Sequence, residues 1–219
     1  MYKTLTSSNN YQVLTTQLKL AEGGSSGNSL HVLTMDYPDP ITISIIGASG
    51  NNQHLSKQIF ERAKDNLKTT IKNLPYSPSQ IILTSGGSSG IDHLAILLYL
   101  KSLSTEPFAG LILHFPCGWN GKFYSKNQYD LKATNLLTLL HSAFSYEIKR
   151  DSIHDIILCV QHPKCYHKSY MGFFQRNDEV AKCDILIAMT FSSGNKPSDG
   201  GTAYTWKKSL APSKIHISL

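Results

Sequence analysis

The stretch QIILTSGGSSGIDHLA, residues 80–95, decides the fold class of this chain. It starts as an apolar run, continues with three glycines and three serines, and ends in the apolar start of a helix. A strand, a glycine-rich loop and a helix in this order are typical of one βα unit in a parallel sheet. So much backbone freedom in one loop predicts a main chain that closely approaches another group.

The residues that follow and precede this stretch repeat the same alternation. The expected strands read as continuous apolar runs, which favours a parallel α/β sheet covered by helices on both faces. A further apolar run, 155–161, is interpreted as a fourth strand or as part of an insertion. The other expected strands are 41–47, 80–84, 108–116, 184–191 and 214–219. The expected helices are 53–74, 90–103, 128–144, 172–183 and 200–210.

Residues 1–40 lie outside this pattern. Two stretches of loose strand character, 11–20 and 30–35, flank a Gly/Ser-rich turn, and YPDP at 37–40 breaks the chain before the next element. We expect an N-terminal arm or hairpin of unknown role here. Residues 41–219 are expected to form the main domain, since 219 residues suit one α/β domain with embellishments.

Composition narrows the class of protein. With 41% hydrophobic and 16% charged residues the chain is foldable rather than disordered. Its net charge of +6 favours anionic partners such as nucleotides, nucleic acid or phosphorylated metabolites. No apolar run has the length of a membrane span, and the first residues lack the apolar core of a secretory signal. The four cysteines show no disulfide spacing, so we expect a reduced, cytoplasmic protein without a membrane partner.

Three glycine-rich loops follow predicted strands. Each can aim backbone N–H groups and the positive end of a helix at an anion. The carboxyl ends of parallel strands share one edge of a sheet, so these loops are expected to lie together. The alternative is that they are tight turns only. The candidate ligand-binding residues are Gly47, Ala48, Ser49, Gly50, Gly86, Gly87, Ser88, Ser89, Gly90, Gly200, Gly201 and Thr202.

Arg176 and Asn177, just before the strand at 184–191, complete the candidate site. An Arg can pair with a phosphate or a carboxylate, and an Asn can read a base edge or a ribose hydroxyl. The alternative is an Arg that pairs with Asp178 or Glu179 on a solvated helix face. Asp92, at the start of a helix, is expected to cap that helix and hold the glycine loop, or to touch a ribose.

Other chemistry-bearing residues form weaker patterns. Cys159, His162, Cys165 and His167 are ligand types for zinc, but their spacing is too tight for an ordinary site, and we expect no metal. Cys117 beside His114 suggests a nucleophile that nothing visibly orients. The loop 115–130 interleaves aromatic residues with lysines, which suits base stacking, a dimer interface or a lid.

Two of these motifs resemble the signatures of a known family. ILTSGGSSGIDHLA, 82–95, is similar to the glycine motif of the SLOG superfamily, which includes DprA, YpsA-like proteins and the LOG cytokinin-activating enzymes. QRNDEVAKCDILIAM followed by GGTAYT is similar to its second signature. The resemblance runs from about residue 41 to the end of the chain. It implies a Rossmann-like sheet, a nucleotide or related ligand along the glycine rim, and a homo-oligomer, commonly a dimer. Its binding positions match Gly47, Gly50, Gly86–Gly90, Asp92, Arg176 and Gly200–Thr202.

One departure from the family bears on catalysis. LOG enzymes carry a Glu shortly after the Gly-Thr turn, where this chain has Thr205. Cleavage of an N-glycosidic bond needs a carboxylate near the sugar, and only Asp92, Asp184 and Asp199 are candidates to replace it. The first hypothesis is therefore the binding of a nucleotide or nucleotide-derived molecule, with no catalytic residue and no other cofactor assigned. The alternatives are LOG-type N-glycosidic hydrolysis or transfer, and single-stranded nucleic-acid binding of the DprA kind.

Overall fold

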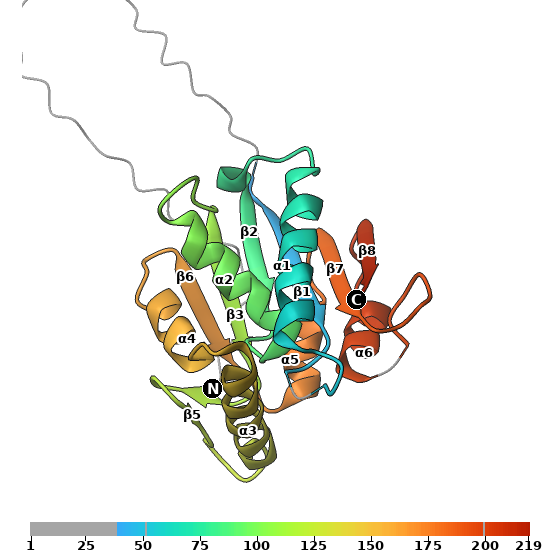
Figure 1. The fold of residues 1–219 in the computed structure, drawn as a ribbon. Coiled ribbons are helices and arrows are strands. Elements are labelled where there is room, and N and C mark those ends of the chain that lie inside the picture. Colours follow the sequence, from blue (N-terminus) through green and yellow to red (C-terminus); the bar gives the residue numbers. More distant parts are fainter. Residues whose placement is uncertain (1–38, 51, 199) are drawn as a thin grey trace, which may run out of the picture. The chain divides into compact units, whose positions relative to one another are not determined.

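The computed structural model describes residues 39–50, 52–198 and 200–219 of the chain. Its main sheet has six strands, all parallel, in the order β6-β3-β2-β1-β7-β8 (Figure 1). These strands are β1 (Ile41–Gly47), β2 (Ile81–Ser85), β3 (Gly110–Phe115), β6 (Cys165–Ser169), β7 (Ile185–Thr190) and β8 (Ser213–Ser218). Two short strands, β4 (Gly118–Trp119) and β5 (Phe123–Tyr124), form a separate antiparallel pair.

Helices connect the strands of the main sheet (Figure 1). The first of them shows why: the Ser56 hydroxyl caps it by accepting from the Ile59 amide, and its buried residues Phe60, Ala63 and Leu67 recur at helical spacing. The helices are α1 (Lys57–Lys72), α2 (His93–Ser102), α3 (Leu131–Ile148), α4 (Ser152–Val160), α5 (Phe173–Val180) and α6 (Gly200–Lys208).

The two faces of the sheet pack into two separate cores. On β1, Ile43 and Ile45 belong to the larger core, which also contains Phe60 of α1 and buried residues of α2, α3 and α4. Ile46 points the other way and packs with Val180 of α5, while α6 covers the same side. Successive side chains of a strand face opposite sides of its sheet, so helices cover both faces. The predicted α/β class, a Rossmann-like parallel sheet with helices on both faces, is confirmed.

One predicted strand is wrong. The run at 155–161 lies in α4, where Ile156 and Cys159 are buried and Leu158 is exposed, a helical rather than a strand pattern. The Asp151 side chain accepts from two amides at the start of this helix and so fixes its beginning. The sheet's fourth strand is instead β6, an edge strand in which Cys165 is the one buried residue.

The structure tests two further expectations only in part, those for residues 1–40 and for the membrane. The N-terminal arm predicted for residues 1–40 lies outside the described residues, apart from Asp39 and Pro40. Among the helices that the structure describes, none combines the length and the apolar character that a membrane crossing requires.

Candidate functional site

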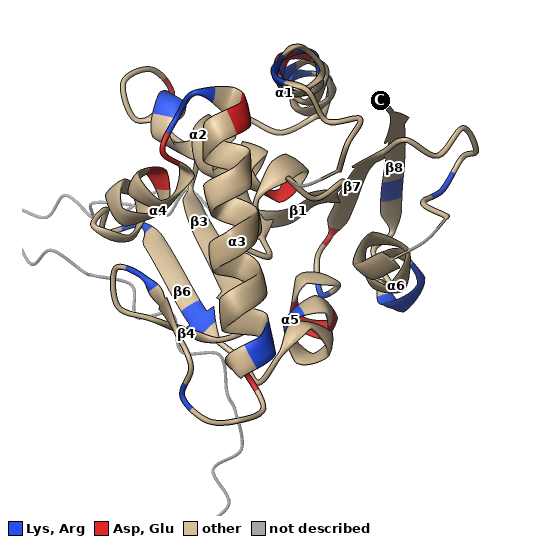
Figure 2. Cartoon of the chain, turned by 60° about the horizontal axis from the view of Figure 1, so that its bottom comes forward, with Lys and Arg blue, Asp and Glu red and all other residues tan. Residues whose placement is uncertain are grey.

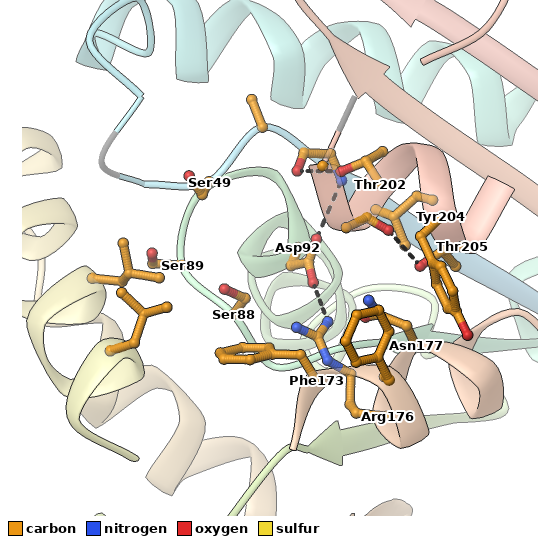
Figure 3. A pocket seen from close by; sticks show the side chains of 18 of the residues that line it. Ser49, Ser88, Ser89, Asp92, Phe173, Arg176, Asn177, Thr202, Tyr204 and Thr205 are labelled. Atoms are coloured by element: carbon orange, nitrogen blue, oxygen red, sulfur yellow. Dashed lines mark hydrogen bonds and ion pairs between the residues drawn. The ribbon is translucent and has the colours of Figure 1, made fainter. Parts of the chain in front are cut away.

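The order of the strands creates a switch point between β1 and β7. The chain adds β2, β3 and β6 on one side of β1, and then β7 and β8 on the other. Ligands of open parallel sheets bind outside the carboxyl ends of the strands at such a point. A pocket of about 1220 Å³ lies there, bordered by Ala48 after β1, Ser88 after β2 and Phe191 after β7. Figure 3 shows Ser88 at this pocket, with Ser49 from the loop after β1.

The pocket gathers most of the predicted site residues. The three loops therefore meet at one end of the sheet, as the pattern predicts. The predicted residues that do not line the pocket are Gly50, Gly86, Gly87 and Gly90. Those that line it are Gly47, Ala48, Ser49, Ser88, Ser89, Asp92, Arg176, Asn177, Gly200, Gly201 and Thr202.

The glycines of the second loop pack against the protein itself. A Cβ on Gly86 would overlap the guanidinium of Arg176, and one on Gly87 would overlap the ring of Phe115. Gly87 also has a φ of +60°, which side chains rarely adopt. A Cβ on Gly90 would meet the backbone of the loop after β1. The groups that approach these glycines are thus parts of the chain, which differs from the expectation of a ligand at each of them.

A buried ion pair lies behind this loop. Arg176 Nη1 is 3.2 Å from Asp92 Oδ2, and the Arg176 residue is only 7% exposed (Figure 3). Asp92 Oδ1 accepts a hydrogen bond of 3.2 Å from the Gly47 amide. Burial raises the pKa of the Asp92 carboxyl to about 6, against the opposing effects of Arg176 and the Gly47 amide. Asp92 is therefore a carboxylate at pH 7, and it joins the end of β1 to α5.

This arrangement decides between the expectations for the two residues. The predicted helix cap is wrong, because the Asp92 side chain accepts no capping hydrogen bond from α2. Its carboxylate does lie against Gly86, in agreement with the other part of that expectation, that Asp92 holds the glycine loop. The alternative pairing of Arg176 with its neighbours is also wrong. Asp178 accepts from the Tyr204 hydroxyl at 2.8 Å, and Glu179 pairs with Lys182. Arg176 is buried at the pocket rather than exposed on a helix face.

Asn177 offers an unpaired amide to the pocket. It is 5% exposed, it lines the pocket beside Arg176, and its side chain forms no hydrogen bond with any described residue (Figure 3). A side-chain amide has two donors and an acceptor that carry a free-energy cost when buried without partners. This amide is therefore positioned to bind a polar group that enters the pocket.

The start of α6 forms the facing wall. Thr202 Oγ1 donates a hydrogen bond of 2.9 Å to the Gly47 carbonyl, which holds the helix start against β1. Gly200 and Gly201, the first two residues of α6, also line the pocket. The first amides of a helix have no partners within it and carry a partial positive charge. The helix start thus suits an anion.

Carboxylates are scarce in this pocket. Thr205 occupies the position of the LOG Glu, and its hydroxyl donates to the Gly201 carbonyl. Asp184 was expected at the rim, but it precedes β7 and bonds to Thr42 at the start of β1, so it lies at the opposite edge of the sheet. Asp199 lies outside the described residues. Among the described residues that line the pocket, Asp92 is the one acid.

One side of the pocket is apolar, and the sequence did not predict it. This apolar wall consists of side chains from α3, from the start of α5, from the segments just before these two helices and from the loop after β7. Phe174 is 71% exposed and packs edge-on against Tyr204, with ring centroids 5.2 Å apart. Aromatic residues next to a glycine-rich site were the available signal in the sequence. The apolar lining residues are Tyr129, Ala133, Leu136, Leu140, Met171, Phe173, Phe174 and Phe191.

The loop of aromatic residues and lysines lies partly in the core. Trp119 and Phe123 are buried, and both pack against Phe115. These two rings are not accessible for stacking on bases. The basic residues of the described chain are spread over helices, strands and loops on several sides of the sheet, among them α1, α2, α3, α5, α6, β6 and β8 (Figure 2).

The cysteines and histidines singled out earlier do not form the sites that their spacing suggested. His114 Nδ1 lies 2.9 Å from the Tyr170 hydroxyl, and burial lowers its pKa to about 4. Cys117 is buried, and desolvation raises its pKa. Cys159 lies on α4 and Cys165 on β6. In the part of the chain that the structure describes, no three Cys, His, Asp or Glu side chains gather as a metal site would require.

Comparison with known proteins gives a relative but no function. No family model matches the chain. It is 38% identical over 186 residues to a protein of Acanthamoeba polyphaga mimivirus that is named uncharacterized protein R261. The aligned region covers 82% of this chain and 96% of the viral protein. Identity of this degree over nearly the whole relative shows that the chain belongs to the same family as the mimivirus protein R261.

Proposed function

We propose that this chain binds a nucleotide or a nucleotide-derived small molecule in the pocket between α3, α5 and α6, as its resemblance to SLOG proteins implies. The observation that carries the proposal is the pocket at the switch point, on which Asn177, Arg176 and the start of α6 converge. Nucleotides are common ligands of parallel sheets at this location.

The polar side of the pocket suits a phosphate group. The start of α6 at Gly200 and the loop at Ser88 offer backbone amides, which stabilise anions. Arg176 Nε is buried without a partner, although the Asp92 carboxylate balances the charge of the guanidinium. Lys132, from α3, also lines the pocket. This small positive charge fits one phosphate better than a chain of three.

The apolar side suits a base. Tyr129, Phe173, Phe174 and Phe191 present aromatic rings, on which the flat face of a base can stack. Asn177 lies between the polar and apolar sides, where its amide can bond to a ribose hydroxyl or to a base edge. The ligand class that matches both sides is amphipathic, with an anionic group at one end and a flat ring at the other.

Binding without glycosidic cleavage is the form of the proposal that the site favours. Asp92 is engaged by Arg176 and by the Gly47 amide, and Thr205 replaces the acid of LOG enzymes. Incubation with nucleoside monophosphates and NAD, followed by chromatography, tests this point. A released base would establish the LOG-type alternative instead.

The direct test is calorimetric titration with AMP, GMP, CMP and UMP, after native mass spectrometry of freshly purified protein for a retained ligand. Asn177→Ala is expected to weaken nucleotide binding by about tenfold, because a buried hydrogen bond contributes about 1 kcal/mol or more. Asn66→Ala, on the exposed face of α1, is the matched control and should change nothing. Unchanged affinity in Asn177→Ala would reject this site.

Salt dependence separates the proposal from single-stranded nucleic-acid binding. A strand that neutralises several phosphates releases counterions, so its affinity falls steeply with salt, whereas one phosphate in a pocket gives a shallow slope. Oligonucleotides that bind more tightly than any mononucleotide, with a steep slope, would favour the DprA-like alternative.

A homo-oligomer is the second part of the proposal, and a cytoplasmic location remains a prediction from sequence. Leu131 and Leu139 on α3 and Met171 near the pocket are exposed, which is typical of an interaction surface. Light scattering of the wild-type protein and of Leu139→Lys tests this part. A monomeric wild type at micromolar concentration would reject it.

A further inference from the structure

His141 of α3 is a fully buried histidine beneath the second glycine loop. Its Nε2 lies 3.2 Å from the Gly87 carbonyl oxygen, and its Nδ1 lies 2.9 Å from Ser152 Oγ. A carbonyl oxygen only accepts hydrogen bonds, so Nε2 carries the proton and donates. In the neutral ring Nδ1 is then an acceptor, and the Ser152 hydroxyl donates to it.

The ring is held in place from three sides. Ser145 Oγ lies 2.8 Å from Ser152 Oγ and accepts from the Ser152 amide at 3.0 Å, which orients the hydroxyl beside the ring. Phe123 packs against the ring with centroids 5.3 Å apart. Burial lowers the pKa of His141 to about 3, so the ring stays neutral and keeps one tautomer near pH 7. His141 is thus a rigid donor aimed at Gly87.

This donor fixes the direction of a peptide group. No cis peptide bond occurs among the described residues, and in a trans peptide the C=O and the N–H point in opposite directions. The Gly87 carbonyl points to His141, so the N–H of the next residue, Ser88, points away from it. Ser88 lines the pocket, and no described residue accepts a hydrogen bond from its amide.

We infer that His141 is a positioning residue, which holds the Gly87–Ser88 peptide so that the Ser88 amide donates to an anionic oxygen of the ligand. The inference rests on the proposed function and adds to it a residue that does not itself line the pocket. Without the hydrogen bond from His141, the peptide at Gly87 is free to turn its carbonyl toward the ligand, because glycine tolerates both orientations.

The first test compares a nucleotide with its nucleoside. Calorimetry with AMP, GMP, CMP and UMP identifies the best ligand, and the ratio of the Kd of its nucleoside to the Kd of the nucleotide measures the phosphate contribution. His141→Phe is expected to lower this ratio about tenfold, as the loss of one hydrogen bond to a charged group predicts. His141→Gln keeps an N–H near the position of Nε2 and is expected to restore the ratio to within about threefold.

The control is another histidine. His162→Phe removes a hydrogen bond of 2.6 Å to the Tyr99 hydroxyl, just before β6 and thus at the far edge of the sheet. It should leave the ratio unchanged. Thermal unfolding shows which variants are folded. A folded His141→Phe with the ratio of the wild type would overturn the inference.

If His141→Phe does not fold, Ser152→Ala is the variant that tests the inference. It is expected to lower the ratio about threefold, and an unchanged ratio in this variant would overturn the inference.

The second test does not require a nucleotide. Inorganic phosphate is titrated into ¹⁵N-labelled protein, and the Ser88 amide resonance is followed. A shift is expected in the wild type, in His141→Gln and in His162→Phe, and none in His141→Phe. No shift in the wild type overturns the inference even if nucleotides bind. A shift without any nucleotide binding rejects the nucleotide as the ligand, and it supports only the part of the inference that concerns anion binding by the Ser88 amide.

Discussion

Arg176 on α5 and Asp92 ahead of α2 form an ion pair of 3.2 Å that closes directly over Gly86. The two residues are 84 positions apart, and both are buried. The pair joins the second glycine loop to α5, so the shape of the pocket and the stability of the domain depend on the same contact.

Gly86→Ala is expected to displace the Arg176 guanidinium, because the added methyl group would occupy its place. We expect a loss of about 1–3 kcal/mol in the free energy of unfolding, as overpacking of a buried site costs. Urea unfolding measures it. Gly194→Ala is the matched control, since a Cβ there meets no atom within 4 Å. Equal stability of the two variants would contradict the contact.

Asp92→Asn is expected to leave Arg176 charged and unpaired in the protein interior. Removal of one partner from a buried ion pair costs about 3–5 kcal/mol, far more than the pair itself contributes. The double variant Asp92→Asn with Arg176→Met should recover part of the loss, because no unpaired charge remains. A single variant as stable as the wild type, again by urea unfolding, would show that the pair is not formed.

Acid is expected to destabilise the protein between about pH 6 and pH 4. Burial lowers the pKa of His141 to about 3 and that of His114 to about 4, below the ordinary 6.5. In this range the unfolded chain therefore binds at least two protons that the folded state does not, and His93, whose pKa burial also lowers, adds to this difference. Asp92, raised to about 6, opposes one of them, since only the folded state protonates it there.

The balance is at least one proton, so the free energy of unfolding is expected to fall by at least about 1.4 kcal/mol for each pH unit of acidification. Urea unfolding at pH 6 and pH 4.5 measures the slope. His141→Gln should reduce it by about one proton, because glutamine does not titrate. A stability that is constant over this range would contradict the burial of both histidines.

The thiols are expected to be slow to react in the folded protein. All four cysteines are free, and Cys117, Cys159 and Cys165 are buried. Burial raises the pKa of Cys165 to about 12, so little thiolate is present at pH 8. Ellman's reagent should react slowly with the native protein and rapidly with four thiols in urea. Rapid reaction of all thiols without urea would show a more open core.

Much of the fold was predictable, because the buried strands of a parallel sheet are apolar on both faces. Residues 41–47 and 184–191 show this signal plainly. The edge strand β6 does not, since Tyr166, His167 and Lys168 are exposed and Cys165 alone enters the core. The apolar run in α4 resembles a strand because a short buried helix and a buried strand of similar length are built from the same kinds of apolar residues.

The site was predictable only where neighbouring residues in the sequence form a recognisable motif. Glycine-rich loops after apolar runs place Ser88 and Gly201 at one edge of the sheet from sequence alone. The Asp92–Arg176 pair and the hydrogen bond from His141 to Gly87 join residues far apart in the chain, so no local spacing indicates them. The apolar wall depends on which face α3 turns toward the pocket, and tertiary packing decides that.

The position of β1 has a consequence for synthesis on the ribosome. β1 pairs with β2 soon after it is made, but its other edge waits for β7, and Thr42 meets Asp184 across 142 residues. A nascent chain that has not yet reached β7 therefore exposes the central strand of the sheet along one whole edge. Such an edge pairs readily with other strands, so elongation through residues 48–184 is the interval in which a chaperone is most valuable to this protein.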